Sequence, residues 1–313
     1  MGNIARKMKR QVKSALHHLG IQQQTLEAIR IFDPRNRRYL SEKIFVADLD
    51  GVEVTFNADD SYSNRWFYPR YADGGIHERK VTEMLMDALR GTRCFADVGT
   101  NLGWYTCIAS KCLPHGIVYG FEMDDLNFGL LEKNLAINQS TNVEAHLAAV
   151  SDSEGTVSYE RSGSNPSPFF QMHGGNGRQT SKTVTVKSIR LDQFFDGKRT
   201  PPDVIKIDVE GAEFSVLKGM TRILREHTPT LFLEIHPTYL KKFGSSSREL
   251  LTLLIDIGYR VVQIESMRED ESALQLTPLT PDSVIESNDM LYAVHNSKSV
   301  CPESSFSASH IPI

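Results

Sequence analysis

Short apolar runs alternate with amphipathic segments along most of the chain from residue 77 onward. The runs "CFADVG" (94–99), "GIVYGFE" (116–122) and "DVIKID" (203–208) are rich in β-branched and aromatic residues, which is typical of strands buried on both faces. The segment 77–91 instead spaces its apolar residues along one helical face and ends at a glycine. This alternation predicts βαβ units, and therefore an α/β fold with a largely parallel sheet and helices on both faces.

The two ends of this region follow other patterns. Two strand-like runs near the C-terminus, 259–265 and 289–295, have no helical segment between them, so we expect them to pair antiparallel. Near the N-terminus, β-rich runs flank Asp50-Gly51, a pair favoured in tight hairpin turns. We therefore expect an N-terminal extension with a β-hairpin over residues 1–75, a main domain over 76–297 and a flexible tail over 298–313.

Charge is unevenly distributed along the chain, whose net charge is −4. Residues 1–40 hold nine lysines and arginines against two acidic residues, so the remainder is acidic. An acidic main domain argues against a nucleic-acid partner. The basic arm could make a weak contact with an anionic membrane surface, but a solvated helix is the interpretation we favour. Without a membrane-spanning run or secretory signal, and with unpaired cysteines, the expected location is cytoplasmic.

One long polar insertion, 161–182, interrupts the alternation and carries the adjacent Phe169 and Phe170. Insertions of this length in compact domains are usually functional lids or disordered segments. The exposed aromatic pair is compatible with a lid that faces a substrate. Both interpretations remain open from the sequence.

The segment "ADVGTNLGWYT" (96–106) joins a predicted strand to a predicted helix and contains Gly99 and Gly103. Glycines allow a tight turn and a close approach to a ligand. The dinucleotide fingerprint G-x-G-x-x-G is absent, and the carboxylate of Asp97 would repel a pyrophosphate. Glu122, at the end of the next strand, is placed to accept hydrogen bonds from ribose hydroxyls. The pattern therefore favours S-adenosylmethionine, which carries an ammonium group and a sulfonium, over a nicotinamide dinucleotide.

Candidates for catalytic residues lie where the fourth and fifth strands of the parallel sheet should end, since open α/β sheets bind ligands at this edge. Asp208 and Glu210 follow one strand, and Glu234 and His236 follow the other. Asp208 would face the methyl donor, and His236 is a candidate general base. Glu213 is interpreted mainly as a helix-start residue.

A metal site is conceivable at this edge, since Asp208, Glu234 and His236 offer two carboxylates and an imidazole to a hard divalent ion. Their spacing in the sequence does not require one, so no metal is expected.

The stretches "FADVGTNLGWYT", "VYGFEMDDLNFGLLEKNLAIN", "AAVSDSEGTV" and "VIKIDVEGAEFSVLKGM" with "LFLEIHP" together resemble the FkbM-type methyltransferases, a class I, Rossmann-like group that depends on S-adenosylmethionine. The resemblance extends over about residues 75–295. It implies a seven-stranded, mostly parallel sheet with an antiparallel last strand. It also implies O-methylation of a hydroxyl on a sugar, glycolipid or polyketide-like acceptor.

By the same resemblance, the methionyl end of the cofactor would lie against Asp97, Gly99, Asn101 and Gly103. Glu122 would hold the ribose, and residues 148–152 would flank the adenine. Two alternatives are kept. One is a catalytically silent scaffold that binds S-adenosylmethionine or a glycan, and the other is a nicotinamide-dependent oxidoreductase. The acceptor and the oligomeric state cannot be read from the sequence.

Overall fold

The computed structural model describes residues 42–60, 62–64, 75–162, 181–197, 199–265 and 273–298. The chain forms two compact units, one of Met1–Phe45 with Ala58–Asp73 and the other of Val46–Asn57 with Gly74–Ile313. In the smaller unit, the amide of Ala58 donates to the carbonyl of Lys43 at 2.8 Å. The basic arm, Phe169, Phe170 and the tail from residue 299 lie outside the described residues, so the interpretations of these segments stay predictions.

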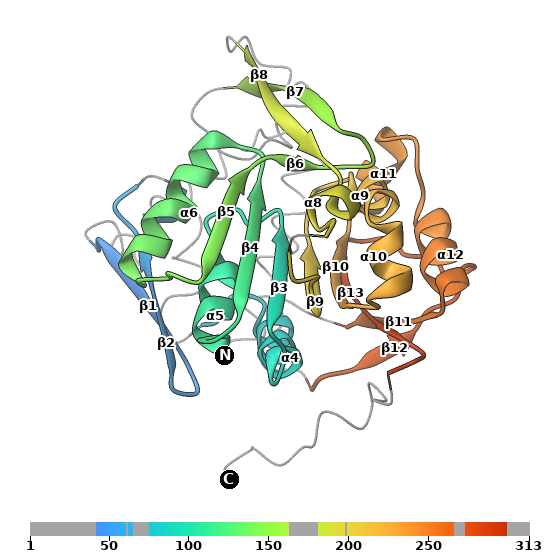
Figure 1. The fold of residues 1–313 in the computed structure, drawn as a ribbon, viewed down its shortest axis with the longest axis horizontal. Helices are drawn as coiled ribbons and strands as arrows, with labels where there is room; N and C mark the ends of the chain where they lie inside the picture. Colours follow the sequence, from blue (N-terminus) through green and yellow to red (C-terminus); the bar gives the residue numbers. More distant parts are fainter. Residues whose placement is uncertain are drawn as a thin grey trace, which may run out of the picture. The chain divides into compact units, whose positions relative to one another are not determined.

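The larger unit is built on an eight-stranded sheet (Figure 1). In spatial order its strands are β12 (Leu276–Pro278), β11 (Tyr259–Ile264), β13 (Asp289–His295), β10 (Thr230–Ile235), β9 (Val204–Ile207), β3 (Cys94–Val98), β4 (Ile117–Glu122) and β5 (Val143–Leu147). The five strands from β10 to β5 are parallel, whereas β13 runs antiparallel to both of its neighbours. The α/β class and the antiparallel last strand are confirmed. The short edge strand β12 makes the sheet one strand wider than expected.

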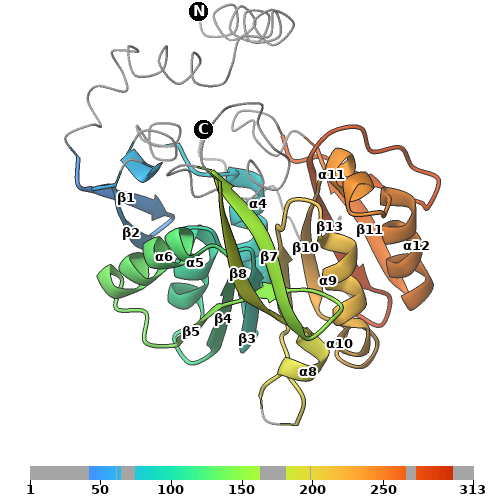
Figure 2. The ribbon, with the colours of Figure 1, turned by 90° about the horizontal axis from the view of Figure 1, so that it is seen from above.

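Helices cover both faces of this sheet (Figure 2). The helices α4 (Arg79–Leu89), α5 (Trp104–Cys112) and α6 (Asp125–Ile137) lie on one face, and α9 (Glu213–Gly219), α10 (Thr221–Glu226) and α12 (Ser247–Ile257) lie on the other. Shorter helices are α8 (Leu191–Phe194) and α11 (Pro237–Lys242). Fully buried aliphatic side chains join the second layer to the sheet, among them Val216, Leu224, Leu250 and Leu254. The hydrophobic effect therefore fixes each strand end relative to the next.

The segment 211–225, which the pattern predicts as one helix, forms two short helices. The break lies at Met220, whose φ of −128° is not helical and whose amide donates to the carbonyl of Leu217 at 3.2 Å. Gly219 precedes it, and glycine has a low helix propensity. The sequence pattern therefore identified the helical character but not the break.

The predicted N-terminal hairpin consists of β1 (Ile44–Leu49) and β2 (Val52–Asn57). Asp50 and Gly51 both have positive φ, as a type I′ turn requires. Phe56 of β2 stacks on Trp104 of α5, with 5.1 Å between ring centroids. β2 is therefore part of the larger unit, and the domain boundary at residue 75 stays a prediction.

The stretch between β5 and β9, expected to be irregular, contains a second sheet. It consists of β6 (Ala149–Val150), β8 (Ser181–Ile189) and β7 (Gly155–Ser162), in that order. The hydroxyl of Tyr159 in β7 donates to Asp124 Oδ2 at 2.9 Å, which ties this sheet to the start of α6. The alternating "TVTVKS" in β8 was a usable strand signal.

Within the ranges that the structure describes, the helices are too short or too polar to span a lipid bilayer.

Candidate functional site

The turn between β3 and α5 is packed tightly against the end of β9. Gly99 has a φ of +83°, and a Cβ at this position would lie 1.8 Å from the carbonyl oxygen of Asp208. A Cβ on Gly103 would lie 2.5 Å from Leu131 Cδ1. Both glycines are therefore required by close packing within the protein, in addition to any approach of a ligand. This packing places the ends of β3 and β9 side by side.

Asp97 lies near the end of β3 with its carboxyl group buried. The hydroxyl of Thr106 donates to Oδ2 at 2.6 Å, whereas Oδ1 has no hydrogen-bond partner among the described residues. Burial raises the pKa of Asp97, and the nearby charge of Lys206 partly opposes this effect. A buried carboxyl oxygen without a partner is costly, so Oδ1 is available to a cationic or hydrogen-donating ligand.

Glu122 ends β4 and holds two backbone amides. Its Oε2 accepts from the amide of Asn101 at 2.7 Å, and its Oε1 accepts from the amide of Asp124 at 2.9 Å. Burial raises the pKa of Glu122 to about 8, although these amides favour the charged form. A carboxylate oxygen can accept more than one hydrogen bond, so ribose hydroxyls can still be accommodated. The expected contact with ribose stays a prediction.

The raised pKa of Glu122 leads to a prediction about stability. The folded state holds this proton more tightly than the unfolded chain, where the pKa is near 4.5. The stabilising contribution is complete below that value and is lost as the pH rises through about 8. We expect the unfolding free energy of the wild type, relative to Glu122→Gln, to fall from about pH 5 to about pH 8, by at most about 1.4 kcal/mol per pH unit. Urea unfolding across this range measures it, and parallel curves for the two proteins would contradict it.

A buried lysine lies at the centre of the site. Lys206 of β9 is 2% exposed, and its Nζ lies 3.4 Å from Asp208 Oδ2 and 4.7 Å from the ring centroid of Tyr105. Burial lowers the pKa of Lys206, but surrounding carboxylates outweigh it and raise the pKa: Asp208, Asp97, Glu78 and Glu234. Sequence reasoning missed this residue. A charged residue between buried β-branched positions in "VIKID" was the signal that could have found it.

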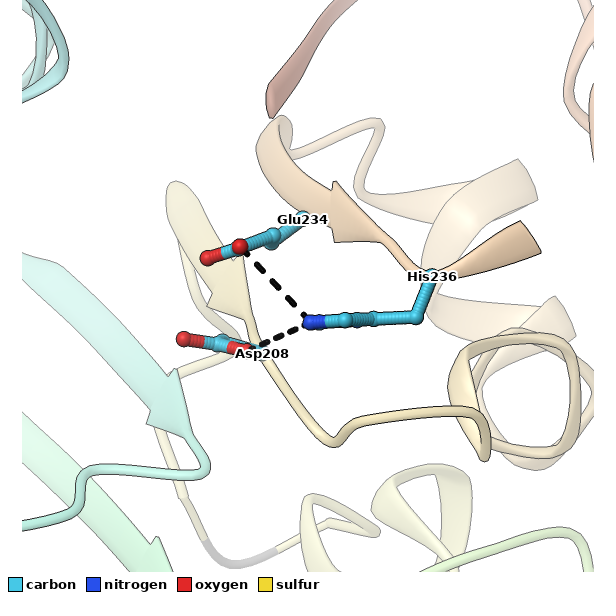
Figure 3. Close-up of side chains that lie close together, drawn as sticks. All are labelled: Asp208, Glu234 and His236. Atoms are coloured by element: carbon cyan, nitrogen blue, oxygen red, sulfur yellow. Dashed lines mark ion pairs between the residues drawn. The ribbon is translucent and has the colours of Figure 1, made fainter. Parts of the chain in front are cut away.

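His236 follows β10 and faces two carboxylates (Figure 3). Its Nε2 lies 3.6 Å from Glu234 Oε1 and 4.0 Å from Asp208 Oδ1. Burial lowers the pKa of His236, but the carboxylates around it outweigh burial and raise the pKa to about 9. For Asp208, burial raises the pKa, but Lys206 and His236 outweigh it and hold the pKa below its usual range. The structure thus brings together three of the four predicted catalytic residues.

Glu213 has a larger role than the sequence indicated. It is the first residue of α9 and its Oε1 accepts from the amide of Gly211 at 2.9 Å, as a helix-start residue would. The same oxygen accepts from His236 Nδ1 at 2.6 Å, and the side chain is fully buried. Sequence reasoning missed this contact because the two residues lie 23 positions apart.

Glu210, the fourth candidate, stands beside this group in a left-handed conformation with a φ of 47°. Burial, with the negative charge of Asp208, raises its pKa to about 7. Its Oε2 is buried and makes no hydrogen bond within the described part of the chain. Its catalytic role stays a prediction.

These side chains share one location, the carboxyl ends of four adjacent parallel strands. Asp97 comes from β3, Glu122 from β4, Asp208 from β9 and Glu234 from β10. This edge of an open α/β sheet is where such folds bind their ligands. Its acidic character suits a ligand with positive charge better than a phosphate.

Comparison with known proteins finds methyltransferases. Residues 97–261 match the model of the methyltransferase FkbM domain. The hexuronic acid methyltransferase AglP of Haloferax volcanii is 32% identical over 160 residues, which are 51% of this chain and 62% of that protein. Methyltransferase sdnD of Sordaria araneosa is 25% identical over 160 residues, 40% of this chain and 59% of its own. The chain thus matches less than two thirds of each of these relatives.

Among solved structures, the FkbM methyltransferase from Methylobacillus flagellatus KT is similar with a TM-score of 0.40 and 18% identity, covering 64% of this chain and 43% of that one.

Proposed function

The chain belongs to the FkbM methyltransferase family, whose model matches more than half of it, and on that premise we propose that it is an S-adenosylmethionine-dependent O-methyltransferase. The observation that carries the proposal is the presence of two buried carboxyl groups, Asp97 and Glu122, near the ends of the adjacent strands β3 and β4. One carboxyl group has a buried oxygen without a partner, and the other holds the turn between β3 and α5.

The residues of the turn fit S-adenosylmethionine. Asp97 Oδ1 would accept a hydrogen bond from the ammonium group, and Glu122 would accept from the ribose hydroxyls. When bound, this cofactor supplies a methyl group on a sulfonium, which is already reactive. A pyrophosphate would instead meet buried carboxyl groups, which disfavours a nicotinamide-dependent oxidoreductase.

The acceptor is proposed to be a hydroxyl on a sugar, glycolipid or polyketide-like molecule. The description of AglP as a hexuronic acid methyltransferase supports a sugar. On this chain, the carboxylate of Asp208 or Glu234 would accept the hydroxyl's hydrogen bond, and Nε2 of His236 would donate to its oxygen and orient it. Such positioning supplies much of the rate enhancement for a reactive donor. A cytoplasmic location and the absence of a nucleic-acid partner stay predictions.

The test is the thermal shift produced by S-adenosylhomocysteine. We expect this compound to raise the melting temperature of the wild type, because it binds only the folded state. Asp97→Asn and Glu122→Gln should each remove most of the shift, whereas Asp256→Asn, which changes an exposed carboxylate on α12, should keep it. A shift with NADH and none with S-adenosylhomocysteine would overturn the proposal.

Turnover separates the enzyme from a silent scaffold. Incubation with labelled S-adenosylmethionine and glycan and lipid extracts should transfer label to an acceptor. A thermal shift without any labelled product from such extracts would favour the scaffold.

A further inference from the structure

Asp208, Glu234 and His236 form a triangle of possible metal ligands. One ligand atom from each lies within 4.8 Å of the other two. Around a divalent cation with bonds of about 2.1–2.4 Å, adjacent ligand atoms are roughly 3.0–3.4 Å apart and opposite ones roughly 4.2–4.8 Å. The distances of 3.6 and 4.0 Å from Nε2 to the two carboxylates fall between these values. Both exceed the usual hydrogen-bond length, so Nε2 is not hydrogen-bonded to either carboxylate at these distances.

Glu213 fixes which nitrogen of His236 faces this space. Its Oε1 already accepts from the amide of Gly211 and acts as an acceptor here too, so Nδ1 of the ring donates across the 2.6 Å contact. A divalent cation bound there would displace the proton of Nε2, whose lone pair would then point toward Asp208 and Glu234. Tyr239 stacks on the ring, with 5.8 Å between centroids and an interplanar angle of 11°. Histidines that bind metals commonly donate their second nitrogen to a carboxylate in this way.

Asp208 divides its two oxygens between different partners. Oδ2 faces Lys206 Nζ at 3.4 Å, and Oδ1 faces His236. The side chain of Asp208 also hydrogen-bonds Glu234, so Lys206 lies on the side of Oδ2 and the three possible ligands lie together.

The triangle lies among further acidic side chains. Six carboxyl groups interact electrostatically with Lys206, with His236 or with one another. They belong to Glu78, Asp97, Asp208, Glu210, Glu213 and Glu234. Buried Oε2 atoms of Glu210 and Glu213 make no hydrogen bonds to other described residues. Buried carboxyl oxygens without a partner are costly, so a cation close to them would be stabilised.

We propose that Asp208, Glu234 and His236 bind a divalent cation of the Mg²⁺ or Mn²⁺ type. Two carboxylate oxygens with one imidazole suit hard cations, which also keep positions for water or an acceptor. The catalytic role of the bound cation rests on the proposed function. The acceptor hydroxyl would replace a water, become more acidic and release its proton to solvent. The O–C bond would then form as the C–S bond breaks, with that electron pair passing to sulfur, giving a methyl ether and S-adenosylhomocysteine.

The experiment titrates chelator-treated full-length protein with Mn²⁺ and follows free Mn²⁺ by electron paramagnetic resonance. We expect one saturable site that Mg²⁺ competes for. Asp208→Asn, Glu234→Gln and His236→Ala should each weaken binding more than about 100-fold, and Glu213→Gln should weaken it about 10–100-fold. The control is His146→Ala, since His146 and Glu144 form a similar pair 3.8 Å apart on β5, to which the described part of the chain adds no third ligand.

Wild-type protein that takes up no Mn²⁺, or His236→Ala that binds it as the wild type does, would overturn the proposal. The melting temperature without ligand, measured on the same samples, confirms that each variant is folded, and the thermal shift with S-adenosylhomocysteine tests the cofactor separately. A normal shift without Mn²⁺ binding would refute the metal site and leave the proposed function intact. Mn²⁺ binding without a thermal shift would support the metal site and refute the proposed cofactor. Full turnover in excess chelator would overturn the catalytic role of the cation.

Discussion

Gly99→Ala is expected to lower the unfolding free energy by more than about 4 kcal/mol, the range reached only by severe packing or backbone defects. A Cβ at this position would lie 1.8 Å from the carbonyl oxygen of Asp208, and a backbone atom cannot rotate away. The φ of +83° adds strain for any residue with a side chain. Relief of the clash requires the ends of β3 and β9 to move apart, so binding of S-adenosylhomocysteine should be lost as well. Urea unfolding and thermal shifts measure both effects.

The matched control is Gly129→Ala in α6. No atom lies within 4 Å of a Cβ at Gly129, and alanine has the higher helix propensity. We expect this variant to be unchanged or up to about 1 kcal/mol more stable. Equal stability of the two alanine variants would contradict the packing of β3 on β9 described above.

Lys206→Met is expected to cost about 3–5 kcal/mol at neutral pH, the range for removing one partner from a buried ion pair. The methionine retains most of the volume but leaves Asp208 and Asp97 without the buried cation that both interact with. Protonation of these carboxyl groups relieves the repulsion, so the deficit relative to the wild type should shrink on acidification. Urea unfolding at about pH 7 and about pH 5 measures the difference.

Two further variants test whether lost charge causes the lower stability of Lys206→Met. Lys133→Met removes an exposed lysine from α6 and should change stability by less than about 0.5 kcal/mol. Adding Asp208→Asn to Lys206→Met should recover part of the loss, because one uncompensated charge is removed. A deficit that is independent of pH and of Asp208 would indicate lost packing instead of lost charge.

The elements predicted from periodicity are those whose pattern arises from local burial. The apolar runs at β3, β4, β9 and β10 form strands, and the Asp50-Gly51 turn forms the predicted hairpin. These patterns are reliable because burial on both faces and a positive φ at the turn each constrain the residue types directly. The β7–β8 pair was missed, since its polar surroundings and the long insertion obscured a real alternation.

For the site, position at a strand end identified Asp97, Glu122, Asp208, Glu234 and His236. The two residues that connect them, Lys206 and Glu213, were overlooked or assigned another role. Lys206 is in the middle of a strand, and Glu213 satisfies the local rule for a helix start. The partner of Glu213, His236, follows another strand, and Lys206 is influenced by carboxyl groups of β3 and β10 as well as by the adjacent Asp208.

The sequence by itself determined the order of strands and helices, the glycine turn and the acidic strand ends, because these depend on residues that are close together in the chain. Only the tertiary structure decided that Gly99 lies against the backbone of Asp208. It also decided that Glu213 holds Nδ1 of His236, and that Lys206 lies among carboxylates from neighbouring strands. The physical reason is that the alignment of adjacent parallel strands follows from packing across the whole sheet. Distances between side chains on different strands are therefore not encoded in any single stretch of sequence.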